Sequence, residues 1–188
     1  NPVVTSWRLD GRNLYEVGSA ELPGNHSVVY NAGLCQYAVK LSIRESPSMT
    51  EVFVARSMSL YEHRVERYLL DDKGVLDPDT QTVLLSIWNN ASWSYMHGLG
   101  EIEIGSDDEL WVFNGYNNWA PLAQDNWSMS GSIMRLNVTE TGEVYPAEGN
   151  PSSLGMDWHP YIYSKGFRMP WTATETTYGW IVGDVGTS

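Results

Sequence analysis

The fold is decided by a stretch that reads Gly100-Glu-Ile-Glu-Ile-Gly105, then Ser106-Asp-Asp108, then Glu109-Leu-Trp-Val-Phe-Asn-Gly115. Isoleucines alternate with polar neighbours in the first segment, and Leu110 and Val112 alternate with polar or aromatic neighbours in the last. Such alternation has the period of two residues that one face of a β-strand requires. Because a triplet of turn-forming residues separates the two segments, the sequence predicts an antiparallel β-hairpin.

Two further stretches resemble this hairpin. In one, Lys40-Leu-Ser-Ile43 and Glu51-Val-Phe-Val-Ala55 flank the polar turn Ser46-Pro-Ser48, and in the other Thr172-Ala-Thr-Glu175 precedes Tyr178-Gly-Trp-Ile-Val-Gly183. Hairpins that recur at irregular spacing are typical of β-propeller blades with loop insertions. A β-sandwich whose hairpins merely look alike is the alternative fold, and the recurrence favours the propeller.

The rest of the chain also favours an all-β fold, with residues 1–188 forming one domain or part of one. Nine Trp, eleven Tyr and 17 Gly suit strands joined by tight turns better than a helical bundle. Further strands are expected at 65–70, 82–87 and 132–138, and a long exposed loop at 145–153. No low-complexity linker divides the chain.

Charge and sequons narrow the range of partners. The formal net charge is −12, whereas nucleic acids and anionic lipid surfaces need clustered Lys and Arg, so neither is an expected partner. No apolar run approaches the roughly 20 residues of a membrane-spanning helix, so no membrane span is expected. N-glycosylation sequons begin at Asn25, Asn90, Asn126 and Asn137, and they predict a secreted, extracellular glycoprotein.

The central hairpin and the histidine before it resemble a signature of the quinone-dependent glucose/sorbosone dehydrogenases. That signature runs His, two residues, Gly, a strand, Gly-Pro-Asp-Gly, and an aromatic strand that ends in Gly-Asp. The matching positions fall in register without a gap: His97, Gly100, Gly105, Asp107, Leu110, Val112 and Gly115. Further segments match in the family's own order: 65–79, 123–125, 131–138, 145–151, 165–171 and 183–186. The likeness covers about residues 28–186.

The resemblance implies about three blades of a six-bladed β-propeller. Relatives of this kind bind pyrroloquinoline quinone (PQQ) on one face together with calcium, and oxidise a sugar hydroxyl or aldehyde. The remaining blades, with further cofactor contacts, would lie on residues outside these 188 or on another chain. Other extracellular protein chains and carbohydrate are the further partners that we expect.

Two residues occupy the family's catalytic positions. His97 would act as the base that removes the proton from the sugar hydroxyl. Arg168 would bind the cofactor and stabilise the negative charge that grows on the quinone oxygens. Each also has an ordinary interpretation, because His97 could be a structural histidine at a strand edge and Arg168 could pair with an acidic side chain.

Two other positions depart from the family pattern. Tyr116 stands where the family has an Asp after the strand-ending Gly, so no carboxylate is offered there to orient the imidazole of His97. Met169 replaces the Asn of the family's Arg-Asn-Pro motif, which removes a polar contact to the cofactor. A glycan on Asn126 would also crowd the cofactor face. The site is therefore expected to be degenerate.

No metal ligands are predicted from the residues themselves. Asp72, Asp77 and Asp79 lie in an acidic segment that lacks the ligand spacing of an EF-hand, so a solvated turn is expected there. PQQ and calcium are expected only if dehydrogenase activity is retained.

The sequence leaves open whether the protein is an enzyme. The favoured function is a non-catalytic extracellular propeller that serves as a structural or interaction module in adhesion, matrix or filament assembly, because a fold does not guarantee inherited chemistry. The alternative is a PQQ-dependent sugar dehydrogenase of the glucose/sorbosone type with an atypical cofactor pocket, which rests on His97 and Arg168. A third function, a ligand receptor that resembles hedgehog-interacting proteins, rests on the same features as the non-catalytic propeller and is not separated from it by the sequence.

Overall fold

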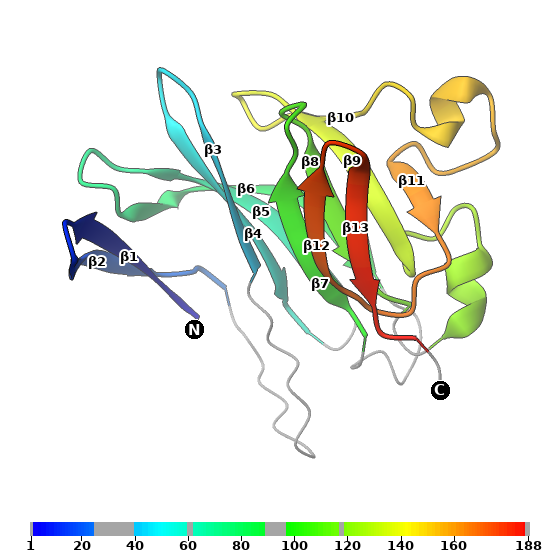
Figure 1. Ribbon diagram of the computed structural model, residues 1–188, viewed down its shortest axis with the longest axis horizontal. Helices are drawn as coiled ribbons and strands as arrows, with labels where there is room; N and C mark the ends of the chain where they lie inside the picture. Colours follow the sequence, from blue (N-terminus) through cyan, green and yellow to red (C-terminus); the bar gives the residue numbers. More distant parts are fainter. Residues whose placement is uncertain (1, 25–39, 60–61, 89–96, 117–118, 187–188) are drawn as a thin grey trace, which may run out of the picture.

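The structure is a computed structural model that describes residues 2–24, 40–59, 62–88, 97–116 and 119–186 (Figure 1). Within these ranges the regular elements are β-strands and two short 3-10 helices. Their bounds are β1 Val3–Asp10, β2 Asn13–Glu21, β3 Lys40–Glu45, β4 Thr50–Ser57, β5 Glu62–Leu70, β6 Leu76–Trp88, β7 Leu99–Ile104, β8 Leu110–Asn114, η1 Ala120–Gln124, β9 Ser132–Val138, β10 Val144–Pro146, η2 Pro151–Leu154, β11 Ile162–Lys165, β12 Pro170–Thr176 and β13 Gly179–Asp184.

The first complete sheet is formed by β3, β4, β5 and β6 in sequence order, and each strand is antiparallel to its neighbour. On β3, the buried Ser42 and Arg44 alternate with the exposed Leu41 and Ile43, so the polar face of this strand is the buried one. On β4, six consecutive residues are buried, which explains why Glu51-Val-Phe-Val-Ala55 is largely apolar instead of alternating. The predicted hairpin over residues 40–55 is confirmed.

The second complete sheet contains β7, β8, β9 and β10, and β11 also pairs with β9. All five residues of β8 are buried. The turn between β7 and β8 is closed by a hydrogen bond of 2.9 Å from the amide of Gly105 to the carbonyl of Glu109, and Asp108 adopts a positive φ of 65°. The central hairpin predicted over residues 100–115 is therefore present, with the expected register of apolar residues.

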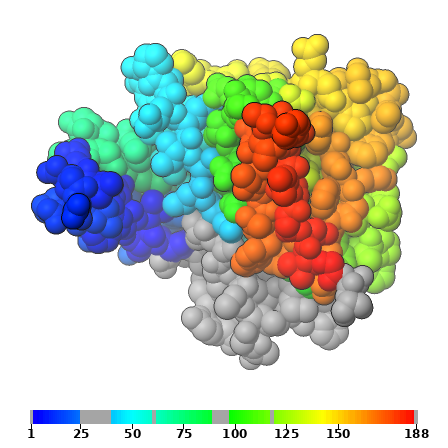
Figure 2. All heavy atoms as spheres, in the orientation of Figure 1, coloured from blue at the N-terminus to red at the C-terminus, as the bar shows by residue number. Residues whose placement is uncertain are grey.

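Two separate hairpins complete the described fold. The hairpin β12–β13 packs on the second sheet, where Ala173 and Trp180 join a buried cluster with Trp111 and Phe113. The hairpin β1–β2 lies at the other end of the molecule and packs on the first sheet through Val4 and nearby apolar residues (Figure 1). In the space-filling view the C-terminal hairpin crosses the front of the molecule and the N-terminal hairpin forms its left edge (Figure 2).

Two sheets of four or more strands and two hairpins amount to about three blades, since a propeller blade has four strands. The all-β prediction is confirmed. The N-terminal hairpin was not among the predicted elements, because most residues of β1 and β2 are exposed and show no clear apolar face.

The two complete sheets are joined by a shared apolar core and by buried charges. Phe53 and Leu85 of the first sheet belong to the same buried cluster as Ile102 and Leu110 of the second. Burial of such side chains is worth about 1.5–3 kcal/mol each relative to exposure. This packing fixes the position of β7 and β8, which carry the candidate site at one end.

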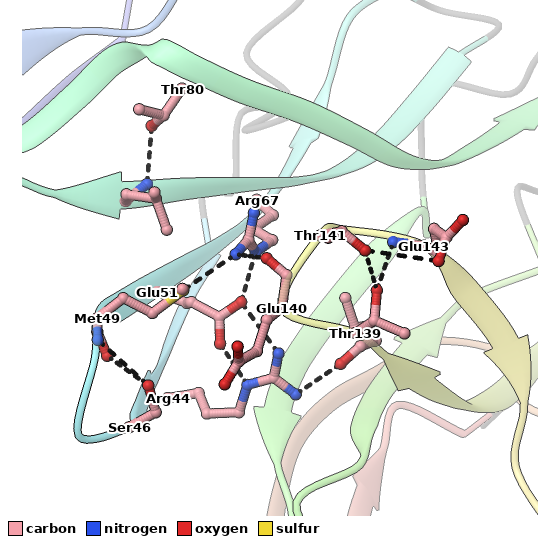
Figure 3. Close-up of polar contacts among 12 residues, drawn as sticks. Arg44, Ser46, Met49, Glu51, Arg67, Thr80, Thr139, Glu140, Thr141 and Glu143 are labelled. Atoms are coloured by element: carbon pink, nitrogen blue, oxygen red, sulfur yellow. Dashed lines mark hydrogen bonds and ion pairs between the residues drawn. The ribbon is translucent and has the colours of Figure 1, made fainter.

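A buried glutamate crosslinks the same interface (Figure 3). Glu51 accepts hydrogen bonds from Arg44, at 2.5 and 3.0 Å, and from the Nε of Arg67. The two guanidinium groups extend to the second blade. Arg44 donates to the carbonyl of Val138 on β9 at 2.9 Å, and Arg67 donates to that of Glu140, in the turn between β9 and β10, at 2.6 Å. Two blades are therefore bridged through one carboxylate.

The long exposed loop predicted over residues 145–153 is only partly correct. The segment begins in β10 and ends in η2, and Ala147 and Asn150 are buried. The amide of Asn150 donates to the carbonyls of Arg135 at 3.0 Å and Pro160 at 2.9 Å. These partners are distant in sequence, so the local Pro and Gly content could not indicate the burial.

The acidic segment that precedes β6 is partly the turn that was expected. Asp71 accepts hydrogen bonds from the amides of Lys73 and Val75 at 2.9 and 2.8 Å, which closes a tight turn. From Leu76 onward the segment is strand β6, so Asp77 and Asp79 lie on a strand instead of in the turn.

Candidate active site

The site lies where four strand ends meet. Strands β7 and β12 begin, and strands β8 and β13 end, at the same end of the antiparallel sheets, and β12 contacts β7 (Figure 1). The segments that enter or leave these strands carry His97, Tyr116 and Arg168, and Asp184 is the last residue of β13. Residues far apart in sequence are therefore brought together by strand pairing.

Gly115 allows three of these segments to pack closely. A Cβ atom at this position would lie 2.1 Å from the carbonyl oxygen of His97 and 2.7 Å from that of Arg168, distances that real Cβ atoms do not adopt. The amide of Gly115 donates to the carbonyl of Gly98 at 2.9 Å, and the amide of Tyr116 donates to that of Arg168 at 3.0 Å. The glycine that ends the family's aromatic strand is thus required by the contact between segments.

His97 stands at the entrance to β7 with its backbone in the left-handed region, at φ 63°. A non-glycine residue there costs roughly 1–3 kcal/mol, and such conformations cluster at functional sites. The ring is half-buried and stacks on the ring of Tyr116, with 5.4 Å between centroids and 22° between planes. The residue predicted as the base is therefore held against the residue that replaces the family's Asp.

Arg168 contacts the same tyrosine through its hydroxyl group. The Nε of Arg168 donates to the hydroxyl of Tyr116 at 3.3 Å, and its Nη1 donates to the carbonyls of Val185 at 3.2 Å and Gly186 at 2.8 Å. Among the described residues, no carboxylate forms an ion pair with this guanidinium. The ordinary interpretation of Arg168, a salt bridge on an acidic surface, is not what the structure shows.

Asp184 holds the backbone on which Arg168 sits. Its carboxylate accepts hydrogen bonds from the amide of Arg168 at 3.1 Å and from that of Met169 at 2.6 Å. This contact uses only the backbone of Met169, so it survives the replacement of the family's Asn. The motif match at residues 183–186 did not predict a role for Asp184. Its partners, the amides of Arg168 and Met169, lie on the segment that enters β12.

Other predicted features lie away from this cluster or outside the described ranges. Asn25 and Asn90 fall outside them. Asn137 is exposed on β9, and the side-chain oxygen of Asn126 accepts a hydrogen bond from Lys165. In the described part of the chain, no group of three or more His, Cys, Asp or Glu side chains could hold a metal ion, and no helix is long and apolar enough to cross a membrane.

Residues 13–179 match the family model described as Glucose / Sorbosone dehydrogenase. The chain belongs to the glucose/sorbosone dehydrogenase family. The match begins at the first residue of β2, upstream of the boundary near residue 28 that the motifs indicated. Among curated proteins, no match was found.

Solved structures named as glucose or aldose sugar dehydrogenases are similar to the chain. A putative oxidoreductase (glucose dehydrogenase) from Thermus thermophilus is 26% identical with a TM-score of 0.65, covering 93% of this chain and 50% of that one. The PQQ-bound form of aldose sugar dehydrogenase from Streptomyces coelicolor is 23% identical with a TM-score of 0.59, covering 97% and 51%. The soluble aldose sugar dehydrogenase from Escherichia coli, in the apo-form, is 19% identical with a TM-score of 0.59, covering 97% and 51%.

The chain thus spans about half the length of these structures. This share agrees with two complete sheets and two hairpins. The predicted fold, about three blades of a six-bladed β-propeller, is confirmed.

Proposed function

We propose that this chain forms the base-bearing part of a PQQ-dependent sugar dehydrogenase and belongs to a single propeller domain. The observation that carries the proposal is the contact of His97 and Arg168 with the same side chain, Tyr116, at one end of the blades. The two residues that occupy the family's catalytic positions are far apart in the sequence and are brought together by the fold. The enzyme interpretation is therefore preferred to the non-catalytic one.

The chemistry assigned to His97 is proton removal from the sugar hydroxyl. A neutral imidazole can accept that proton while the adjacent carbon gives up a hydride, which leaves a carbonyl in the product. PQQ, when bound, supplies the hydride acceptor. The stack on Tyr116 fixes the plane of the imidazole, which a base must present correctly to its substrate.

Arg168 fits the task of holding an anionic quinone. Its Nε and Nη1 are occupied by Tyr116 and two backbone carbonyls, and Nη2 makes no hydrogen bond to the described residues. An available donor on a permanently charged group suits a quinone oxygen that becomes negative. Among the described residues no carboxylate forms an ion pair with this guanidinium, so its charge is not taken up by a salt bridge.

No calcium ligands are assigned within the described part of this chain. Within it, no group of three or more His, Cys, Asp or Glu side chains could hold a metal ion, and the carbonyls of Val185 and Gly186 already accept from Arg168. A calcium ion that accompanied the quinone would take its ligands from other residues, including the remaining blades.

The two departures from the family do not remove the site. Tyr116 cannot supply a carboxylate, but it contacts both His97 and Arg168. Met169 keeps the backbone contact to Asp184. No contact among the described residues, and none of the three similar structures named above, favours an adhesion, matrix or filament module, or a receptor of the hedgehog-interacting kind.

The proposal extends to location and partners. The exposed sequon at Asn137 supports a secreted glycoprotein, with the other sequons as further candidates. The main partner would be the remaining blades of the same propeller, and carbohydrate would be the substrate. Open edges on the terminal hairpins support this closure, because sheet edges are normally paired or covered.

The test is cofactor reconstitution of the protein that contains these residues together with the remaining blades. We expect stoichiometric PQQ binding in the presence of calcium, sugar-dependent reduction of an artificial dye, and loss of turnover in His97→Ala. The matched control is His159→Asn, whose parent histidine packs between Trp127 and Tyr161 and not with Tyr116. A protein that binds no PQQ, or a His97→Ala variant with full turnover, would refute the proposal.

A further inference from the structure

We propose that Tyr116 is a positioning residue that joins the base and the cation of the site into one unit, an inference that rests on the proposed function. The family has an Asp at this position, so the resemblance predicts only that the carboxylate that orients the base is lost. The structure instead places the Tyr116 side chain between His97 and Arg168, in contact with both.

The first contact is made by the aromatic ring. The planes of His97 and Tyr116 are 22° apart at a centroid distance of 5.4 Å, so the imidazole stacks on the phenol with a lateral offset. The ring contact therefore restricts the orientation of the imidazole, which a carboxylate would otherwise set.

The second contact is made by the hydroxyl group. The oxygen of Tyr116 accepts a hydrogen bond from the Nε of Arg168 at 3.3 Å. The same guanidinium is fixed by the carbonyls of Val185 and Gly186. Because three acceptors hold Arg168, its orientation is set, and through the tyrosine that orientation is linked to the plane of the imidazole.

The backbone around Tyr116 is fixed as firmly as its side chain. Its amide donates to the carbonyl of Arg168 at 3.0 Å, and its carbonyl accepts from the amide of Trp119 at 3.0 Å. Gly115, directly before it, tolerates no Cβ atom. The tyrosine is therefore presented from a rigid support, as a positioning residue requires.

Two substitutions separate the ring from the hydroxyl. Tyr116→Phe keeps the ring on His97 and removes the acceptor of Arg168, whereas Tyr116→Leu removes both contacts. Tyr178→Leu is the matched control, because Tyr178 is fully exposed at the turn between β12 and β13. If Tyr116 positions the base, Tyr116→Leu lowers kcat by about 10- to 100-fold, the usual effect of displacing a reacting group.

The direct readout is the NMR signal of the His97 ring in protein labelled at histidine carbons. Stacking on an aromatic ring shifts the imidazole C–H resonances. We expect the shift in the wild type and in Tyr116→Phe, its loss in Tyr116→Leu, and no change in Tyr178→Leu. Tyr116→Phe should have a raised Kd for PQQ and a smaller loss of kcat than Tyr116→Leu.

The two readouts distinguish this inference from the function on which it rests. If Tyr116→Leu leaves both the His97 resonances and kcat unchanged, the positioning role is refuted while the dehydrogenase stands. If the wild-type protein oxidises no sugar, the proposed function and the role of Tyr116 in it both fail, even where the resonances confirm the stack. Loss of the shift together with a reduced kcat supports the inference.

Discussion

The ring of His97 lies against the ring of Tyr116, with 5.4 Å between centroids and 22° between planes. The hydroxyl of that tyrosine accepts a hydrogen bond from Arg168. A residue that departs from the family pattern is thus the one that both catalytic candidates contact. This geometry, and the blade interface that supports it, can be tested by substitution.

Replacing Arg168 by Lys should weaken PQQ binding although the charge is kept. A lysine has no planar fork, so it cannot contact Tyr116, two carbonyls and a quinone oxygen at once. Loss of one charged hydrogen bond corresponds to roughly 10- to 100-fold in affinity. Titration calorimetry with PQQ measures this. Arg8→Lys, on exposed β1, is the control, and equal affinities in both variants would contradict the role of Arg168.

Adding a single methyl group at Gly115 should damage stability and activity together. The Cβ of Gly115→Ala would lie 2.1 Å from the carbonyl oxygen of His97, so the segments of the site must separate. Overpacking of this kind costs about 1–3 kcal/mol. Urea unfolding measures the loss. Gly186→Ala, where a Cβ meets no atom within 4 Å, should leave the free energy of unfolding unchanged.

Glu51→Gln should destabilise the junction of the two blades. The substitution leaves the buried guanidinium group of Arg67 without its carboxylate, and it leaves Arg44 with only the more distant, exposed Asp108 at 3.8 Å. Breaking a buried ion pair costs about 3–5 kcal/mol. Glu45→Gln, on an exposed position of β3, should change the free energy of unfolding by less than about 0.5 kcal/mol. Comparable losses of unfolding free energy in both variants would show that the network in Figure 3 does not stabilise the junction more than an exposed carboxylate does.

The same carboxylate should make stability depend on pH. Burial alone would raise the pKa of Glu51, but the hydrogen bonds and charges of Arg44 and Arg67 outweigh burial and lower it below the ordinary value of 4.5. Its contribution to stability is therefore complete above that value and is lost as pH falls through the lower, folded pKa. Urea midpoints measured from pH 7 downward should fall more steeply in the wild type than in Glu51→Gln. Parallel curves would count against this assignment.

Local sequence patterns predicted the hairpins well. The strands around the turns at 46–48 and 106–108 alternate in hydrophobicity or carry a continuous apolar run, and both signals are local. The hairpin β1–β2 was missed because only a few of its side chains, such as Val4 and Ala20, pack on the first sheet. A strand that buries few side chains shows only a weak alternation of apolar and polar residues in its sequence.

The site was predicted in its residues but not in its contacts. His97 and Arg168 could be located from the family motifs, since these are linear. The role of Tyr116 could not be predicted from the sequence. Its partner Arg168 is 52 residues away, and the hydrogen bond between them depends on how β12 packs beside β7. The same reason hid Asp184, whose partners are backbone amides on another segment.

The central claim is that these residues form part of a working sugar dehydrogenase site. The most direct measurement is anaerobic mixing of the PQQ-loaded complete protein with an aldose, followed by the absorbance of the quinone. We predict that one equivalent of quinone is reduced per site in the wild type and that reduction is abolished in His97→Ala. A quinone that stays oxidised in the wild type, with PQQ bound and sugar in excess, would contradict the account.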